Sequence, residues 1–174
     1  MYNNYKKLSE EIKLYGDNIA LAFGCFDVLH TGHIAFIEKI RKQTKLPVFI
    51  GVLSDKTVSD RKGKDRPFFS EQDRSVIMSS LKNVDKAFII CEYGDFEIYK
   101  KEFELSEKDR EFWSTVIYCL DVLRPAEFYY STDFKMTEKI EAFFSSRNIK
   151  KTAVPYAENI SSTEYIQKMK NTVI

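Results

Sequence analysis

The sequence predicts an α/β fold: a Rossmann-like open parallel sheet of about five strands, with helices on both faces. Short apolar runs of strand length alternate along the chain with stretches in which apolar residues recur at helical spacing. Strands that alternate with helices pair in parallel through right-handed crossovers. With 174 residues, 44% of them hydrophobic, the chain is long enough to bury one core. We therefore treat residues 1–174 as a single domain.

The first strand is expected at Ile19 to Phe23, a continuous apolar run that ends at a glycine. Such a run is typical of a strand buried on both faces. An amphipathic helix that stops at Gly16 is expected before it, and a helix with a stripe of isoleucines after it. The remaining strands are expected at 47–53, 86–90, 126–131 and 150–154, and the remaining helices at 70–81, 106–123, about 137–146 and from about 162 onward.

The connection at about 92–124 is longer than one crossover needs, and we interpret it as a helical insertion. Its predicted helix begins at Ser106, with Asp109 completing the cap. Its aromatic residues would cover a substrate, form a subunit contact or, as is more common, pack the extra helix.

The composition indicates which kinds of binding partner and cellular compartment to expect. The formal net charge is +1, which favours neither a nucleic acid nor another polyanion. Cys25, Cys91 and Cys119 lie far apart, so neither a disulfide framework nor a zinc site of ordinary spacing is expected. No apolar run approaches the ~18 residues of a membrane span. A cytoplasmic protein that binds no membrane is expected.

Both histidines of the chain fall in "GCFDVLHTGH", residues 24–33, directly after the first strand. Ligands of open parallel sheets bind at this end of the strands, where helix N-termini favour phosphate. Gly24 and Gly32 let the backbone turn and approach a ligand, and His30 and His33 are able to donate hydrogen bonds to phosphate oxygens. A single histidine is more often a surface or core residue. A metal site would need more ligands than these two and Asp27.

This stretch resembles the G-x-F-D-x-x-H-x-G-H signature of the cytidylyltransferase-like nucleotidyltransferases. Residues 54–85 are similar to the loop, arginine-bearing helix and "VD" ending of bacterial heptose-phosphate adenylyltransferases. Residues 158–169, "ENISSTEYIQKM", are similar to the family's I-S-T-T-x-x-I element. The resemblance covers most of the chain outside the connection at 92–124.

The resemblance implies an enzyme that joins a nucleoside triphosphate to a phosphorylated small molecule and releases pyrophosphate. It implies that His30 and His33 stabilise the reacting phosphates. Lys62 corresponds to the loop lysine of the family, with Lys64 as its rival, within a basic loop expected at 56–66. Arg74 corresponds to a triphosphate-binding arginine, the alternative being an exposed arginine on a surface helix.

Further roles follow from the same resemblance. Asp27 corresponds to an aspartate near the acceptor, although an aspartate in a turn is often only a local hydrogen-bond acceptor. The hydroxyls of "ISSTE" suit a β- or γ-phosphate, but they also make an ordinary helix cap. Cys25 is interpreted as a small filler and not a nucleophile. The nucleotide-binding set is Gly24, Cys25, Phe26, Gly32, Lys64, Arg74, Asp133, Ser161, Ser162 and Thr163.

The chain departs from the family after the fourth strand, where "YYSTDFK" has Asp133 but no glycine before it. The added side-chain bulk leaves the choice between ATP and CTP open. Mg²⁺ is expected to arrive with the triphosphate, and a homodimer is expected from the family. The leading hypothesis is a nucleotidyltransferase acting on a sugar, polyol or amino-alcohol phosphate.

Two other classes compete with this hypothesis. One is a non-catalytic, regulatory nucleotide-binding protein on the same fold. The other is a class I aminoacyl-tRNA synthetase, which has a related H-x-G-H and a second motif that "FKMTEK" faintly resembles. The short chain and the near-neutral charge argue against tRNA binding.

Overall fold

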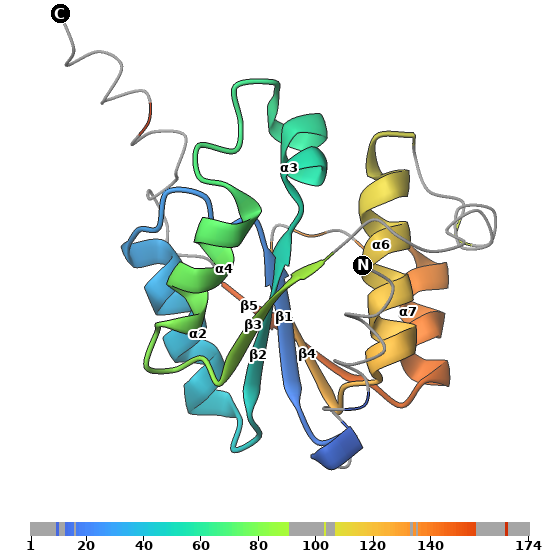
Figure 1. The fold of residues 1–174 in the computed structure, drawn as a ribbon. Coiled ribbons are helices and arrows are strands. Elements are labelled where there is room, and N and C mark those ends of the chain that lie inside the picture. The colour runs from blue at the N-terminus through green and yellow to red at the C-terminus, as the bar shows by residue number, and fades with distance from the viewer. Residues whose placement is uncertain are drawn as a thin grey trace, which may run out of the picture.

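The computed structural model describes residues 10, 13–15, 17–90, 103, 107–132, 134, 136–155 and 166. Within them lies a five-stranded parallel sheet in the order β3-β2-β1-β4-β5, which confirms the predicted Rossmann-like fold (Figure 1). The strands are β1 (Ala20–Gly24), β2 (Val48–Leu53), β3 (Lys86–Ile90), β4 (Glu127–Ser131) and β5 (Lys150–Val154).

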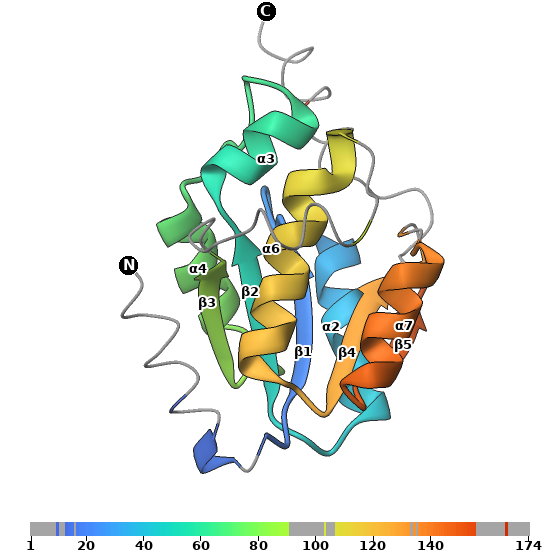
Figure 2. The same cartoon turned by 90° about the vertical axis from the view of Figure 1, so that its right-hand side faces the viewer.

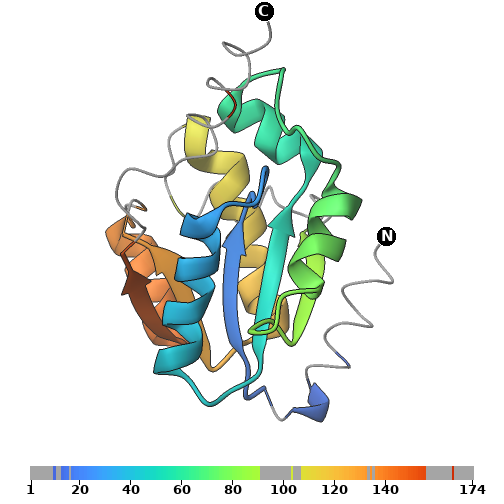
Figure 3. The same cartoon turned by 90° about the vertical axis from the view of Figure 1, so that its left-hand side faces the viewer.

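Helices cover both faces of the sheet, as predicted. On one face lie α2 (Thr31–Gln43) and α4 (Glu71–Ser79), blue and green in Figure 3. On the other lie α6 (Glu107–Leu123) and α7 (Glu138–Ser146), which Figure 2 shows side by side. The short helix α3 (Asp55–Lys62) sits above the carboxyl ends of the strands. Each face therefore has its own apolar core.

The alternation of side chains along β1 builds these two cores. Ala20 and Ala22 point toward α2, where they pack with Ile37 and Ile40. Leu21 and Phe23 point into the cluster formed with α6 and α7. Because successive strand residues face opposite sides, a strand in the middle of the sheet must be apolar throughout. β1 pairs with β2 on one side and β4 on the other, so its carboxyl end lies in the middle of the sheet edge.

The helix predicted inside an insertion is instead the crossover between β3 and β4. Trp113, Val116 and Leu120 of α6 are buried in the same cluster as Phe23 of β1. An added helix would lie outside the core, whereas α6 supplies much of it. Phe103 and Phe112 are buried there as well, so these aromatics pack the fold. The capping residues Ser106 and Asp109, and the rest of 91–106 apart from Phe103, lie outside the described side chains.

The predicted basic loop at 56–66 is a helix in its first part. The Ser54 side chain accepts a hydrogen bond from the Thr57 N–H, which caps α3. Asp55 lies in the first turn, and Arg61 and Lys62 in the last, each where the helix dipole favours its charge. A serine at position 54 is a common helix cap, but the dense positive charge of residues 56–66 indicated a loop.

Other helix boundaries agree closely with the prediction. Ser70 caps α4 by accepting from the Asp73 N–H, and Thr137 caps α7 by accepting from the Ile140 N–H. The amphipathic helix expected before Gly16 and the helix expected from about 162 fall largely on residues outside those described. Among the described residues, no helix has the length and apolarity to cross a bilayer.

The order of the strands creates a switch point between β1 and β4. From β1 the chain passes through α2 to β2 on one face, and it later returns through α6 on the other face to place β4 beside β1. In open parallel sheets the crevice outside the strand ends at such a point binds ligands. The histidine-bearing stretch begins there.

Gly51 in β2 gives a test of how tightly this sheet is packed. A Cβ atom at Gly51 would lie 2.3 Å from Cδ1 of Phe23 and 2.7 Å from Cδ1 of Ile90. We expect Gly51→Ala to lower the free energy of unfolding by roughly 1–3 kcal/mol, as overpacking does. Urea denaturation measures this change in the free energy of unfolding. Adding Phe23→Leu to Gly51→Ala should recover part of the lost stability. If the effects of the two substitutions simply add, the Phe23 ring is not the cause of the loss.

Candidate functional site

The loop between β1 and α2 lies at the switch point and carries unusual backbone geometry. Phe26 and Val28 have φ values of 51° and 53°, in the left-handed region that side chains other than glycine rarely adopt. For a β-branched residue such as Val28 this conformation is strained, at a cost of order 1–3 kcal/mol. Gly24 is needed for packing, because a Cβ there would lie 2.7 Å from the Phe26 ring. The loop holds its shape because surrounding contacts fix it.

His30 and His33 form a reciprocal capping box at the start of α2. His30 is the N-cap, and its Nδ1 accepts a hydrogen bond from the Gly32 N–H at 3.1 Å. The Nδ1 of His33 accepts from the His30 N–H at 3.4 Å. Imidazoles thus replace the serine and glutamate of a usual capping box. Gly32, expected in the turn before the helix, lies in its first turn.

The capping box decides which nitrogen of each ring carries the proton. A neutral imidazole has one donor and one acceptor nitrogen. Because Nδ1 accepts in both rings, Nε2 carries the proton in both. The two rings stack with their centroids 3.9 Å apart. The Gly32 N–H in the first turn of α2 is engaged by the His30 imidazole.

Burial keeps these imidazoles neutral. Desolvation lowers the pKa of His33 from its ordinary value of 6.5 to about 3, helped by the charges of His30 and Lys62 and opposed by that of Asp27. The pKa of His30 is lowered as well, first by burial and then by the charge of Lys62. Phe26, against His33 at 5.4 Å between ring centroids, is part of the apolar surroundings. At neutral pH both histidines are uncharged donors.

Lys62, the predicted loop lysine, is the last residue of α3, which lies above the carboxyl ends of the strands (Figure 2). Its positive charge contributes to the lowered pKa of both imidazoles. Lys62 is solvent-exposed, as is its rival Lys64 in the following turn. Arg61 stacks on the Phe112 ring, 4.2 Å from the ring centre, and so joins α3 to α6.

Asp27, predicted to lie near the acceptor, is bonded within the protein. Its Oδ2 accepts from Nε of Arg66 at 2.6 Å, and its Oδ1 accepts from the N–H groups of Phe68 and Phe69 at 2.9 and 3.0 Å. Burial raises the pKa of Asp27, but these bonds outweigh it and leave the pKa below its ordinary value. Direct contact with an acceptor would require some of them to open.

Arg74 is fully buried, so the alternative of an exposed helix arginine is wrong. Its Nη1 donates to the Cys25 carbonyl at 2.6 Å, its Nη2 to Oδ1 of Asp55 at 2.6 Å, and its Nε to the Phe69 carbonyl at 3.0 Å. These bonds join the motif loop, the start of α3 and the segment before α4. The predicted contact of Arg74 with a triphosphate stays a prediction, since its three nitrogens donate to protein oxygens here.

Sequence reasoning missed the roles of Arg66 and Asp55. Arg66 was counted only as one charge of a basic loop, and Asp55 was not singled out. Their partners Asp27 and Arg74 lie 39 and 19 residues away, and no local pattern signals such pairs. A buried arginine within a basic stretch looks the same in sequence as an exposed one.

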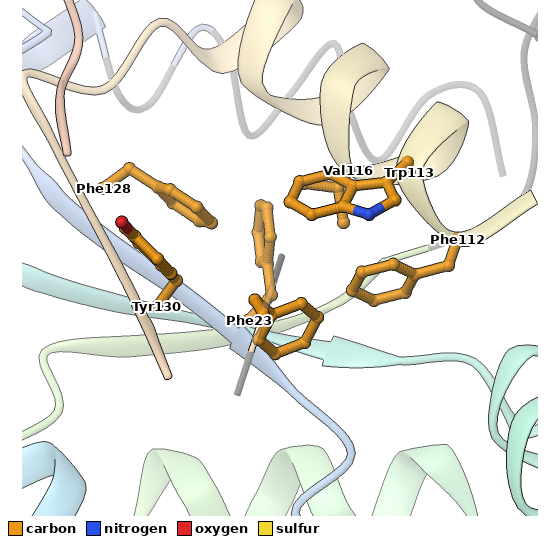
Figure 4. A pocket seen from close by; sticks show the side chains of 7 residues that line it. Phe23, Phe112, Trp113, Val116, Phe128 and Tyr130 are labelled. Carbon is orange, nitrogen blue, oxygen red and sulfur yellow. The ribbon is translucent and has the colours of Figure 1, made fainter. Parts of the chain in front are cut away.

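An aromatic wall forms on the α6 side of the sheet, near the ends of β1 and β4. Figure 4 shows rings from both strands and from α6 converging on a cavity of about 10 Å³. That volume is about the size that one water needs, and water also needs polar partners, which are scarce here. The wall is therefore closed packing. Its residues are Phe23, Phe112, Trp113, Val116, Phe128, Tyr130 and Phe134.

Four predicted nucleotide-binding residues lie outside the described part of the chain: Asp133, Ser161, Ser162 and Thr163. Gly24, Cys25, Phe26 and Gly32 are brought to the switch point with the histidines. Cys25 is partly buried, and its carbonyl holds Arg74. Among the described residues, no three histidine, cysteine, aspartate or glutamate side chains are grouped to bind a metal.

The strain at Val28 predicts an unusual gain in stability. We expect Val28→Gly to raise the free energy of unfolding by roughly 1 kcal/mol, because glycine adopts a φ of 53° without steric cost. Val28→Ala, which keeps a Cβ at the same φ, is the matched control and should give no comparable gain. Thermal and urea denaturation of the three proteins measure this. If both variants lose stability equally, the side chain matters more than the strain.

The lowered pKa of His33 predicts a loss of stability in mild acid. Unfolded His33 binds a proton near pH 6.5, whereas folded His33 binds one only near pH 3, so the unfolded state holds more protons between these values. Stability should therefore fall as the pH drops below 6.5, by at most about 1.4 kcal/mol per pH unit from this residue.

Urea denaturation between pH 7.5 and 5 measures this loss, and His33→Asn serves as the comparison. The variant keeps a polar side chain at the third helical position but has no imidazole to protonate. Its stability should depend less on pH than that of the parent chain. Equal pH dependence in the two proteins would contradict the lowered pKa.

Comparison with known proteins agrees with this geometry. The sequence model of the cytidylyltransferase-like family matches residues 21–168. "Bifunctional protein HldE" of Helicobacter pylori strain G27 is 27% identical over 96% of this chain and 31% of its own length, and that of Aliarcobacter butzleri is 32% identical over 57% and 21%. The chain thus spans only about a fifth to a third of these curated relatives.

Solved structures share the fold. The lipopolysaccharide core biosynthesis protein of Thermoplasma volcanium aligns with a TM-score of 0.56 at 22% identity, over 82% of this chain and 98% of its own. Pantothenate synthetase of Thermus thermophilus aligns with a TM-score of 0.62 at 15% identity, over 96% of this chain and 68% of its own. With the family match over most of the chain and the two imidazoles at the switch point, this protein belongs to the cytidylyltransferase-like family of nucleotidyltransferases.

Proposed function

We propose that this chain transfers a nucleoside monophosphate from ATP or CTP to a phosphorylated small molecule and releases pyrophosphate. The observation that carries the proposal is the pair of stacked, neutral imidazoles at the start of α2. A sugar phosphate is the first acceptor to test. The resemblance of residues 54–85 to heptose-phosphate adenylyltransferases supports that choice.

The reaction needs no general base. An oxygen of the acceptor phosphate, already anionic at neutral pH, attacks the α-phosphorus of the nucleotide. The new bond joins that oxygen to the α-phosphorus, and the bond from the α-phosphorus to the β-bridging oxygen breaks, so its electron pair leaves with pyrophosphate. Negative charge increases on the phosphate oxygens during this exchange, and fixed donors around them lower the barrier.

The histidines suit the role of fixed donors better than that of acid or base. Each Nδ1 accepts from a backbone N–H, which leaves Nε2–H as the donor of each ring. A pKa of about 3 at His33 means that the ring stays neutral while it donates. The N–H that bonds to Nδ1 also polarises the ring and strengthens its Nε2–H as a donor. These donors need no reorientation during the reaction, which is the condition for electrostatic stabilisation.

Lys62 supplies the positive charge in this proposal. It lies at the exposed end of α3, where it is able to approach a triphosphate bound over the two imidazoles. The triphosphate is expected to bring Mg²⁺ on its own oxygens. ATP and CTP are both candidates, because Asp133 lies outside the described residues.

Pyrophosphate release tests the proposal. The purified chain is incubated with Mg²⁺, ATP or CTP, and a panel of sugar, polyol and amino-alcohol phosphates. We expect release that depends on one nucleotide and one class of acceptor. His33→Ala and Lys62→Ala should each lower kcat by roughly 10²-fold, the usual effect of removing one stabilising donor.

Lys45→Ala is the matched control, since Lys45 is an exposed lysine beyond the C-terminal end of α2, away from the histidines. It should react like the parent chain, and circular dichroism confirms that every variant is folded. Unchanged turnover in His33→Ala would exclude the mechanism. Nucleotide binding by calorimetry without pyrophosphate from any acceptor would favour a regulatory nucleotide-binding protein instead.

A further inference from the structure

Asp27 and Arg66 form a buried ion pair between two loops of the site. The Asp27 side chain is fully buried and that of Arg66 is 9% exposed. Both Nε and Nη2 of Arg66 lie 2.6 Å from Oδ2 of Asp27. The other carboxylate oxygen holds the N–H groups of Phe68 and Phe69. One carboxylate therefore fixes three residues of the segment that connects α3 to α4.

The chain between this pair and Lys62 is short and internally bonded. The Arg66 N–H donates to the Gly63 carbonyl at 3.0 Å, and the Gly63 N–H donates to the Ser59 carbonyl at 2.8 Å. The end of α3 is thus linked to Arg66 through a tight turn. Lys62 lies only four residues before Arg66, so a displacement of Arg66 would move the end of the helix that bears Lys62.

The beginning of α3 is attached to the same region of the fold. The Asp55 N–H donates to Oε2 of Glu71 at 2.8 Å, and Oδ1 of Asp55 accepts from Arg74. Arg74 in turn holds the Cys25 carbonyl beside Asp27. The first residue of α3 is held in this way, while its C-terminal end, which carries Lys62, is held by the contact of Arg61 with the Phe112 ring and by the turn to Arg66.

We propose that the Asp27–Arg66 pair is a positioning device that holds the end of α3 over the motif loop, so that Lys62 lies beside His30 and His33. Asp27 and Arg66 act through Lys62 and need not touch a substrate. The charge-assisted hydrogen bond from Nε of Arg66 to Oδ2 is directional, and removal of one partner leaves a buried charge without compensation. The positioning is a statement about the protein alone, while its effect on catalysis rests on the proposed function.

The two histidines, the only ones in the chain, report directly on the position of Lys62. The charge of Lys62 on α3 acts on both histidines, and His33 is affected also by His30 and by Asp27 on the motif loop. For His30, the charge that lowers the pKa is that of Lys62. If Lys62 moves away, the pKa of His30 must rise.

The experiment is an NMR pH titration of the histidine ring protons in the full chain, using Arg66→Gln, Lys62→Gln and the double variant. We expect each single variant to shift the His30 titration midpoint upward. In the Lys62→Gln background, Arg66→Gln should produce no further shift, because the charge whose position it controls is already gone. A direct effect of the unpaired Asp27 charge on His30 would be the same with and without Lys62, so the comparison of the two backgrounds separates it from the effect of a displaced Lys62.

Arg41→Gln is the matched control, since Arg41 lies on the same helix as His30 and pairs with Asp85. It removes an ion-paired arginine but should leave the His30 midpoint unchanged. Arg66→Lys keeps the charge and loses the hydrogen bond from Nε to Asp27, so a smaller upward shift is expected. It also serves as the test variant if Arg66→Gln does not fold by circular dichroism.

Two results would overturn the positioning role. In one, Lys62→Gln raises the His30 midpoint but Arg66→Gln and Arg66→Lys do not. In the other, Arg66→Gln raises it equally with and without Lys62. In the transferase assay, Arg66→Gln should lower kcat/KM by roughly 10- to 100-fold, less than additively with Lys62→Gln. A parent chain without transferase activity would refute the proposed function, while the titration would still decide the positioning.

Discussion

The capping box of His30 and His33 is the interaction on which both the fold and the site depend. It satisfies two backbone N–H groups at the start of α2, which would otherwise be buried without partners. The same two bonds leave Nε2 as the protonated nitrogen of each ring and stack the rings 3.9 Å apart. The side chains that meet a structural requirement of the helix are therefore the same ones that we propose as phosphate donors.

The geometry of this capping box depends in turn on a strained loop. Phe26 and Val28 adopt left-handed φ values, and contacts on both sides of the loop hold them there. The Asp27 carboxylate is bonded to Arg66, and the Cys25 carbonyl is bonded to Arg74. Strain of this kind persists only where the surroundings over-determine the backbone. The buried arginines, located far along the chain, thus maintain the arrangement of the histidines.

Much of the fold was predictable because its signals are local. β1, β2 and β3 are runs rich in apolar residues, and the helices predicted at 70–81 and about 137–146 begin after the caps Ser70 and Thr137. Two predictions failed for the same reason. The stretch containing α3 was expected to be a loop because of its charge, and α6 was expected to be an insertion because of the long connection before it. In each case, what the segment packs against decides its role, and packing is not a local property of sequence.

The sequence alone determined the family, because both histidines and their glycine fall within ten consecutive positions. It could not determine what Asp27, Arg66 and Arg74 do, since an acid or a base looks the same in sequence whether it faces a substrate or another side chain. The tertiary structure decided this by bringing residues 39 or more positions apart into hydrogen-bonding distance. The strand order, also a tertiary property, places the motif at the switch point of the sheet.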